Sequence, residues 1–327
     1  MTVSSALVPL PVGDAVDHIE LPAFGVHPST RHVLDRAAAL AINAAIATER
    51  PLLVRGEPGT GKSQLARAAA VRLGRDFLLH SVDARTETRD LLYTVDAVSR
   101  LALAQLAGAR GVVRSKAIDD LAVMNFVHPG ALWWAYDRKT AHEQAVVASA
   151  PKLLTDGVEG RGVVLLIDEI DKADPSVPNG LLDTFGNGRF SVEGRRDVVA
   201  GSPRPLVLIT TNEERALPDA FVRRCLVLHI ELPKLPEKRD AFIAALVLRG
   251  SANVPSASDT VLNTAAGLIA DERIELTKHA VCLPGVAEYV DLLRAVTSLA
   301  DGEAAQIALL REIKALATRK HPLERST

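Results

Sequence analysis

The stretch that decides the fold is Leu52-Leu53-Val54-Arg55-Gly56-Glu57-Pro58-Gly59-Thr60-Gly61-Lys62-Ser63, or LLVRGEPGTGKS. It starts as a short apolar run that ends in glycine, which is typical of a buried strand. The residues that follow, GKSQLARAAAVRLG, have helical spacing and end at Gly74, a residue type that often terminates helices. DFLLHSV then has the composition of a second strand. Strand, loop, helix and strand in this order form a βαβ unit, so the sequence predicts a parallel sheet.

The loop inside this stretch has the pattern of a phosphate-binding loop, G-x-x-x-x-G-K-[ST]. Its glycines let the backbone curl until successive N–H groups face one point, and the positive end of the next helix adds to the same field. We expect Lys62 to reach the β- and γ-phosphates of ATP and the Ser63 hydroxyl to ligate Mg²⁺. A simple turn with a surface lysine is the alternative, and it leaves the flanking strand and helix unexplained. The expected nucleotide-binding residues are Gly56, Glu57, Pro58, Gly59, Thr60, Gly61, Lys62, Ser63 and Gln64.

Two later apolar runs also end in polar residues. VVLLI leads into Asp168 and Glu169, and LVLITT leads into Asn212. Ligands of parallel α/β sheets bind at the carboxyl edge, where such residues gather. We expect Asp168 to hold Mg²⁺, Glu169 to act as general base on the attacking water, and Asn212 to contact that water and the γ-phosphate. The alternatives are helix capping by the acids and turn formation by the asparagine. For the neighbouring Asp171 and Asp174, capping or solvation is the preferred interpretation.

Two adjacent arginines follow a short helical pattern in LPDAFVRRC. Such pairs are usually solvated surface charge. Phosphoryl transfer, however, benefits from an arginine that a neighbouring subunit supplies to neutralise charge in the transition state. We assign this role to Arg224 or, as the alternative, to Arg223.

With these four elements in order, the chain resembles AAA+ ATPases. GEPGTGKS, LLIDEIDKAD and ITTNEERALPDAFVRRC are similar in particular to the MoxR-like branch. The resemblance implies an α/β fold, a P-loop αβα sandwich around a central parallel sheet, with a C-terminal helical lid. It implies a Walker A loop at 56–63, Walker B acids at 168–169, sensor 1 at Asn212 and an arginine finger at Arg224 or Arg223. It also implies a homo-oligomeric ring, most often a hexamer, with ATP between subunits.

The sequence departs from many relatives at the sensor-2 position. The matching stretch, LPGVAEYVDLLRA, has no arginine at the expected place. Arg294, about two turns later, and Lys278, upstream, are the candidates to replace it; the alternative is a lid that senses nucleotide only weakly.

The domain organisation follows from prolines and from the change in pattern. Residues 1–28 contain several prolines and are expected to form an irregular N-terminal arm, followed by a helix from Ser29 to Thr48. TRDLLYTVDAVSRLALAQL reads as helical, and GRFSVEGRRDVVAG as a β-hairpin. Four helical patterns follow LPKLPEK, so we place a nucleotide-binding core at 29–232 and a lid at 233–327. The long interval between Lys62 and Asp168 predicts an insertion near 94–135.

The aromatic cluster in ALWWAYD has two interpretations. Trp133, Trp134 and Tyr136 are expected to pack in the core, with a substrate-gripping pore segment as the alternative. Arg195 and Arg196 in the predicted hairpin are expected to be solvated, or else to face a threaded chain.

The composition is that of an ordinary globular protein. Of 327 residues, 48% are hydrophobic, and the formal net charge is −2, which does not favour nucleic acid as a partner. The two cysteines lie far apart, so disulfides are not expected. The N-terminus lacks a basic signal region, and no apolar run reaches the roughly 18 residues of a membrane span. We expect a cytoplasmic protein without a membrane segment.

Three functions are compatible with these motifs. The first is a remodelling or chaperone-type ATPase that acts on a separate protein, either a client or a co-encoded partner. The second is a nucleotide-dependent regulatory switch in a bacterial defence or signalling system. The third, a nucleic-acid motor, is disfavoured by the near-neutral charge.

Overall fold

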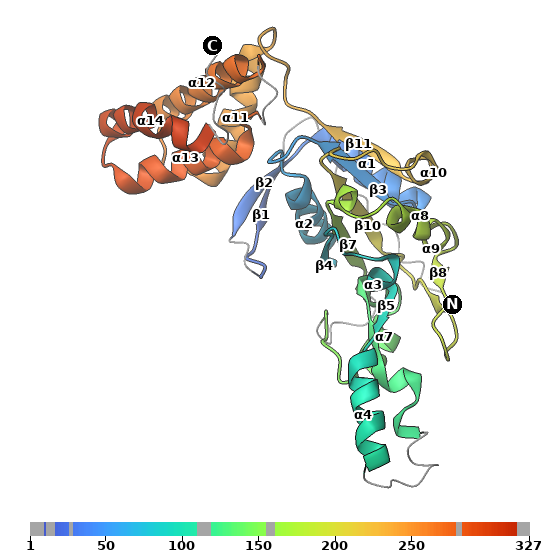
Figure 1. The fold of residues 1–327 in the computed structure, drawn as a ribbon. Coiled ribbons are helices and arrows are strands. Elements are labelled where there is room, and N and C mark those ends of the chain that lie inside the picture. Colours follow the sequence, from blue (N-terminus) through green and yellow to red (C-terminus); the bar gives the residue numbers. More distant parts are fainter. Residues whose placement is uncertain are drawn as a thin grey trace. The chain divides into compact units, whose positions relative to one another are not determined.

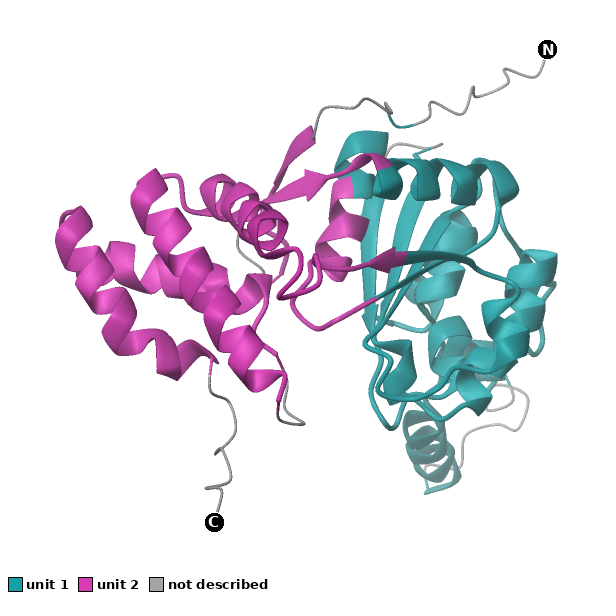
Figure 2. Cartoon of the chain, turned by 90° about the horizontal axis from the view of Figure 1, so that it is seen from above, with its two compact units in different colours: residues 1–12, 37–55, 69–228 teal, residues 13–36, 56–68, 229–327 magenta. Residues whose placement is uncertain are grey.

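The computed structural model describes residues 10, 17–25, 29–109, 119–154, 161–278 and 283–318. The chain divides into two compact units (Figure 2). Unit 1 comprises Met1–Val12, Ala37–Arg55 and Ala69–Leu228, and unit 2 comprises Gly13–Arg36, Gly56–Ala68 and His229–Thr327. The predicted N-terminal arm and insertion lie partly outside the described residues, and the three predicted domain boundaries stay a prediction.

A five-stranded sheet forms the centre of the fold (Figure 1). Its order is β11-β3-β10-β7-β4, and the pairings of β3 with β10, β10 with β7 and β7 with β4 are parallel. The predicted α/β fold with a central parallel sheet is therefore confirmed. The strands are β3 (Leu52–Gly56), β4 (Asp76–Ser81), β7 (Val163–Asp168), β10 (Leu206–Thr211) and β11 (Leu226–Ile230).

The central strands form because their apolar runs are buried on both faces. Val163–Ile167 of β7 and all of β10 are buried without alternation, as expected for parallel strands covered on both sides. Helix α6 (Ala131–Tyr136) packs against β4 and β7 on one face. The other helices before β11 are α1 (Arg36–Thr48), α2 (Lys62–Leu73), α3 (Thr88–Leu92), α4 (Ala97–Ala109), α7 (Arg138–Val147), α8 (Ser176–Gly180), α9 (Leu182–Asn187) and α10 (Asp219–Val222).

Helix α6 carries the aromatic cluster into the core of unit 1. Trp133 and Trp134 are fully buried, and Tyr136 is nearly so. Trp133 donates through Nε1 to the Thr140 hydroxyl over 2.9 Å, and its ring packs edge-on against Phe190. The prediction of core packing is therefore confirmed, and the alternative of a pore segment is wrong.

Unit 1 also contains short antiparallel pairs of strands. β5 (Tyr93–Val95) pairs with β6 (Val127–Pro129), and β8 (Arg189–Phe190) pairs with β9 (Val198–Val199). The second pair is the predicted hairpin, with Gly194 at its turn in a left-handed conformation, φ 77°. The guanidinium of Arg195 lies 5.1 Å from the centre of the Trp133 ring, so this arginine is held on the core aromatic.

Unit 2 contains four of the chain's long helices and a two-stranded sheet. Its core is built from apolar side chains of all four helices, among them Phe242, Tyr289 and Leu310. The predicted helical region is thereby confirmed. The elements are β1 (Asp17–Leu21), β2 (Thr30–Leu34), α11 (Arg239–Asn253), α12 (Asp259–Leu276), α13 (Val286–Leu299) and α14 (Glu303–Thr318).

Two predictions of local structure are wrong. Helix α1 begins at Arg36 rather than Ser29, because 30–34 pair with 17–21 in an antiparallel ladder. The same ladder shows that residues 17–21 are not irregular. In the predicted helix 88–106, strand β5 separates α3 from α4, because it pairs with β6 about 35 residues later.

Candidate functional site

The phosphate loop joins β3 to α2 with the backbone that its sequence requires. Helix α2 begins at Lys62, and Gly59 and Gly61 have φ of 74° and 93°. Residues with a Cβ rarely adopt these values. A Cβ on Gly56 would lie 2.4 Å from the carbonyl oxygen of Ile230. The loop glycines are therefore needed for the shape of the loop and for its packing.

Lys62 and Thr60 make contacts inside the loop. The Lys62 ammonium donates to the carbonyl oxygens of Gly56 and Glu57 over 2.6 and 2.9 Å. The Thr60 hydroxyl donates to the same Glu57 oxygen over 2.9 Å. Lys62 is 7% exposed, so its charge is held within the loop and does not extend into solvent.

A histidine that the sequence analysis missed lies beside the loop. His32 of β2 is nearly buried, and an added Cβ on Gly61 would lie 3.8 Å from its ring. Its side chain is hydrogen-bonded to Gln64. Burial lowers the pKa of His32 to about 4, and the charge of Arg249 acts in the same direction. His32 is therefore neutral at physiological pH.

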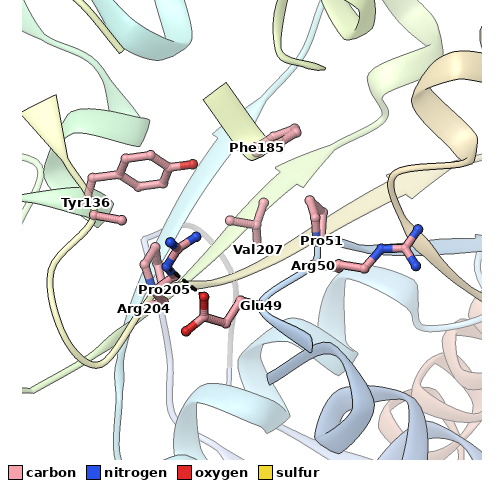
Figure 3. Close-up of a pocket in the computed structure, with 9 residues that line it drawn as sticks. Glu49, Arg50, Pro51, Tyr136, Phe185, Arg204, Pro205 and Val207 are labelled. Carbon is pink, nitrogen blue, oxygen red and sulfur yellow. Dashed lines mark ion pairs between the residues drawn. The ribbon is translucent and has the colours of Figure 1, made fainter. Parts of the chain in front are cut away.

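The carboxyl ends of β3, β10 and β7 lie at one edge of the sheet. Arg55 is opposite Thr211, and Ile209 is opposite Ile167, so the residues after these strands project from the same edge. The phosphate loop follows Arg55 directly in the chain. At the other edge, near the first residues of β3 and β10, Pro51 and Pro205 line a cavity of 20 Å³ (Figure 3). This cavity has the size of about one water molecule and is too small for a nucleotide.

Thr210 links Asp168, the last residue of β7, to Glu169, the residue after it. Its hydroxyl donates to Asp168 Oδ1 over 2.5 Å and accepts from the Glu169 backbone N–H over 2.8 Å. Glu169 itself has a left-handed backbone, with φ 60° and ψ 51°. Such a conformation costs a non-glycine residue about 1–2 kcal/mol. The Thr210 hydrogen bond is one of the contacts that stabilise it.

The Glu169 carboxylate has partners on both oxygens. The side-chain amide of Asn212 donates to Oε1 over 3.0 Å, and the Lys172 ammonium forms an ion pair with Oε2. The hydrogen bond and the charge of Glu169 raise the pKa of Lys172. The structure thus brings together the predicted Asp168, Glu169 and Asn212.

Asp171 is a residue of this site whose role the sequence analysis judged wrongly. It is 3% exposed, not solvated. Its Oδ2 accepts from the backbone N–H groups of Asn212 and Glu214 over 3.2 and 3.0 Å. Glu213, between them, has a left-handed φ of 62° and pairs with Arg55. Asp171 therefore holds the turn that carries Asn212.

Arg223 and Arg224 follow α10, and both are exposed. Arg224 donates through Nη1 to the carbonyl oxygen of Leu182. The Arg50 guanidinium donates to the carbonyl oxygens of Arg223, Arg224 and Cys225. This arrangement fixes the backbone of the arginine pair.

Among the described residues, no group of three or more His, Cys, Asp or Glu side chains is arranged to hold a metal ion. None of the described helices is both long and apolar enough to cross a membrane.

Comparison of the sequence with known protein families identifies one match. Residues 51–225 match the family model described as AAA domain (dynein-related subfamily). No curated protein matches the sequence. Among solved structures, a mutant of Thermotoga maritima RuvB is similar at 15% identity and a TM-score of 0.45, over 85% of this chain and 68% of that one. The Thermotoga maritima RuvB Holliday junction branch migration motor is similar at 16% identity and a TM-score of 0.42, over 84% and 66%.

The family match covers more than half of the chain, including the phosphate loop, Asp168, Glu169 and Asn212. The chain belongs to the AAA domain family, in its dynein-related subfamily.

Proposed function

We propose that this protein is a Mg²⁺-dependent ATPase of the AAA+ class that works as a ring and remodels a protein partner. One observation carries the proposal. Asp168 ends β7 and Glu169 follows it, the Asn212 amide contacts the Glu169 carboxylate, and both strand ends lie at the edge from which the phosphate loop continues. A carboxylate and an amide at this edge can orient a water molecule for attack on a phosphate.

The residues present suit a nucleotide and its metal ion. The N–H groups of 59–63 and the start of α2 provide donors for phosphate oxygens, and Lys62 provides a compensating charge. Ser63 and Asp168 would supply oxygen ligands to Mg²⁺. This ion keeps several waters and needs few protein ligands. When bound, Mg²⁺ would neutralise phosphate charge.

The protein side chains then have separate tasks. Glu169 accepts a proton from the attacking water, and Asn212 orients that water and the terminal phosphate. Lys172 forms an ion pair with Glu169 and so helps to hold the carboxylate in place. Arg224, with Arg223 as the alternative, would reach the phosphate of a neighbouring subunit and stabilise the transition state.

The remodelling role and the MoxR-like branch rest on the motif resemblance alone. The alternative is a nucleotide-dependent switch with slow turnover. The first turn of α13, Val286-Ala287-Glu288, carries no arginine, and this feature favours the alternative.

Two variants test the ATPase proposal. Lys62→Ala is expected to abolish ATP binding, and Glu169→Gln to preserve binding while it stops phosphate release. Arg239→Ala, which breaks an ion pair with Asp271, is the control and should match wild type. The proposal is wrong if Glu169→Gln hydrolyses ATP at the wild-type rate. Proteins that co-purify with Glu169→Gln only in the presence of ATP would identify the partner, and a complete absence of them would favour the switch.

A further inference from the structure

The phosphate loop is tied to the helices of unit 2 by an ion pair between residues 216 positions apart. Arg273, near the end of α12, donates through Nη2 to Glu57 Oε2 over 2.5 Å. Glu57 is the second residue of the loop, and its carbonyl oxygen accepts from Lys62 and Thr60. The position of Glu57 therefore affects the side chain expected to bind phosphate.

Arg273 is the fixed member of this pair. Its side chain is 9% exposed, compared with 52% for Glu57. Nη1 donates to the Pro284 carbonyl oxygen over 3.0 Å, and the guanidinium lies 5.7 Å from the centre of the Phe242 ring. These contacts come from α11 and from the residues before α13, and they fix Arg273 independently of Glu57. Arg273 therefore determines the position of the more exposed Glu57.

The loop also packs against the start of α13. A Cβ on Gly59 would lie 3.0 Å from Ala287 Cβ, and one on Gly285 would lie 3.8 Å from the Pro58 carbonyl oxygen. Residues 57–59 thus contact the helical part through the ion pair and through close packing. Lys278 and Arg294, the two cations proposed from the sequence for the sensor-2 role, have other surroundings than Arg273. Lys278 pairs with Glu275, and Arg294 is exposed.

We propose that Arg273 is a positioning residue for ATP binding, which holds the phosphate loop in its binding shape through Glu57. This inference rests on the proposed function of the loop. A charge-assisted pair with one buried member is strong, and a loop that is already ordered loses less entropy when a ligand binds. Arg273 acts through the loop and not by direct contact with phosphate.

The test measures the dissociation constant of a fluorescent ATP analogue, together with Tm without nucleotide. Arg273→Met removes the cation and leaves the Glu57 carboxylate unpaired near the phosphates. The double variant Arg273→Met/Glu57→Gln removes both charges, so any remaining effect arises from lost positioning. The control is Arg239→Met, which breaks an exposed ion pair to Asp271 between α11 and α12.

We expect Arg273→Met to weaken binding at least about tenfold and the double variant about threefold to tenfold, within the usual range for coupled groups. The KM for ATP should rise in parallel, with kcat changed less than about twofold. Arg239→Met should bind as wild type does. Wild-type affinity in the double variant would overturn the inference, since only charge would then matter.

A second variant covers the case in which Arg273→Met does not fold. Arg273→Lys keeps the charge but cannot bridge Glu57 and Pro284 with a planar fork. Its affinity should lie between those of wild type and the double variant, and unchanged affinity would overturn the inference. If wild-type protein fails to bind the analogue, the proposed function itself is wrong. If it binds while all Arg273 variants bind equally well, only the inference fails.

Discussion

The side-chain amide of Asn212 lies 3.0 Å from the carboxylate of Glu169, although 43 residues separate them in the chain. Each follows the end of a different strand, β10 or β7, and these strands are direct neighbours. Asp171 fixes the Asn212 backbone, and Thr210 binds the Glu169 backbone. The relation between amide and carboxylate is therefore set by the sheet and by two supporting side chains.

Replacement of Asn212 should affect chemistry more than binding. In Asn212→Asp, a second carboxylate would face and repel Glu169 at close range, and it would have no N–H to orient the attacking water. We expect kcat to fall about 10²–10³-fold, comparable with loss of a transition-state donor. Steady-state phosphate release and ATP binding measure the two effects separately. The control is Asn263→Asp, at an exposed position of α12, which should leave kcat and ATP binding unchanged. A wild-type kcat in Asn212→Asp would refute the proposed role of the amide.

Asp171 should matter for stability as well as for turnover. Asp171→Ala leaves the N–H groups of Asn212 and Glu214 without their acceptor at a part-buried turn. We expect the free energy of unfolding to fall by about 2–3 kcal/mol, together with kcat, in urea titrations and activity assays. Asp174→Ala is the matched control, because Asp174 is exposed and caps only a local turn at Ser176. Its effect should stay below about 1 kcal/mol. If Asp171→Ala also lowered the free energy of unfolding by less than about 1 kcal/mol, the turn that carries Asn212 would not depend on Asp171.

Stability should decrease in weak acid because of His32. Burial lowers its pKa to about 4 in the folded protein, whereas the unfolded chain titrates near about 6.5. Between these values the unfolded state binds more protons, so the free energy of unfolding falls as pH drops through this window. Arg249 opposes the charged imidazole, while Gln64 and Asp35 favour it.

The complete contribution of His32 is about 3–4 kcal/mol. Urea titrations at about pH 7 and pH 4.5 should therefore differ less for His32→Gln than for wild type. His18→Gln, at an exposed position of β1, is the control and should keep the wild-type difference. His80, whose pKa burial also lowers, adds a change of the same sign in every variant. An unchanged pH dependence in His32→Gln would exclude His32 as the cause.

Arg224 should act on a neighbouring subunit. We expect Arg224→Ala to bind ATP normally and to lose turnover, because the arginine completes the site of another copy. Mixing it with Lys62→Ala should restore part of the activity, since some interfaces then combine an intact loop with an intact arginine. Arg215→Ala, whose guanidinium donates to the Lys172 carbonyl oxygen, is the control and should need no rescue. Absence of rescue at every mixing ratio would argue against a shared site.

The sequence allowed most of the sheet and of the site to be predicted, for a physical reason. Each central strand is an apolar run buried on both faces and followed by a polar or glycine-rich loop, so its limits are visible locally. The same rule located Asp168, Glu169 and Asn212, since parallel strands end at one edge.

The failures concern contacts that no local pattern records. Residues 30–34 form a strand only because 17–21 pair with them, and their polar composition did not distinguish them from the start of α1. Asp171 looked like a solvated acid, and its burial depends on the turn after β10. The contact of Arg273 with Glu57 joins two remote segments, so neither segment alone predicts it. Burial decided between the two interpretations of Trp133.

The left-handed backbone at Glu169 has a consequence for protein engineering. Glycine tolerates this conformation without a steric penalty, and asparagine adopts it more readily than glutamate does. Selection of variants by heat resistance alone would then favour Glu169→Gly, which relaxes the main chain and at the same time removes the carboxylate. Libraries of this protein therefore need a screen for turnover alongside the screen for thermal resistance, because the most heat-resistant clones are expected to include inactive ones.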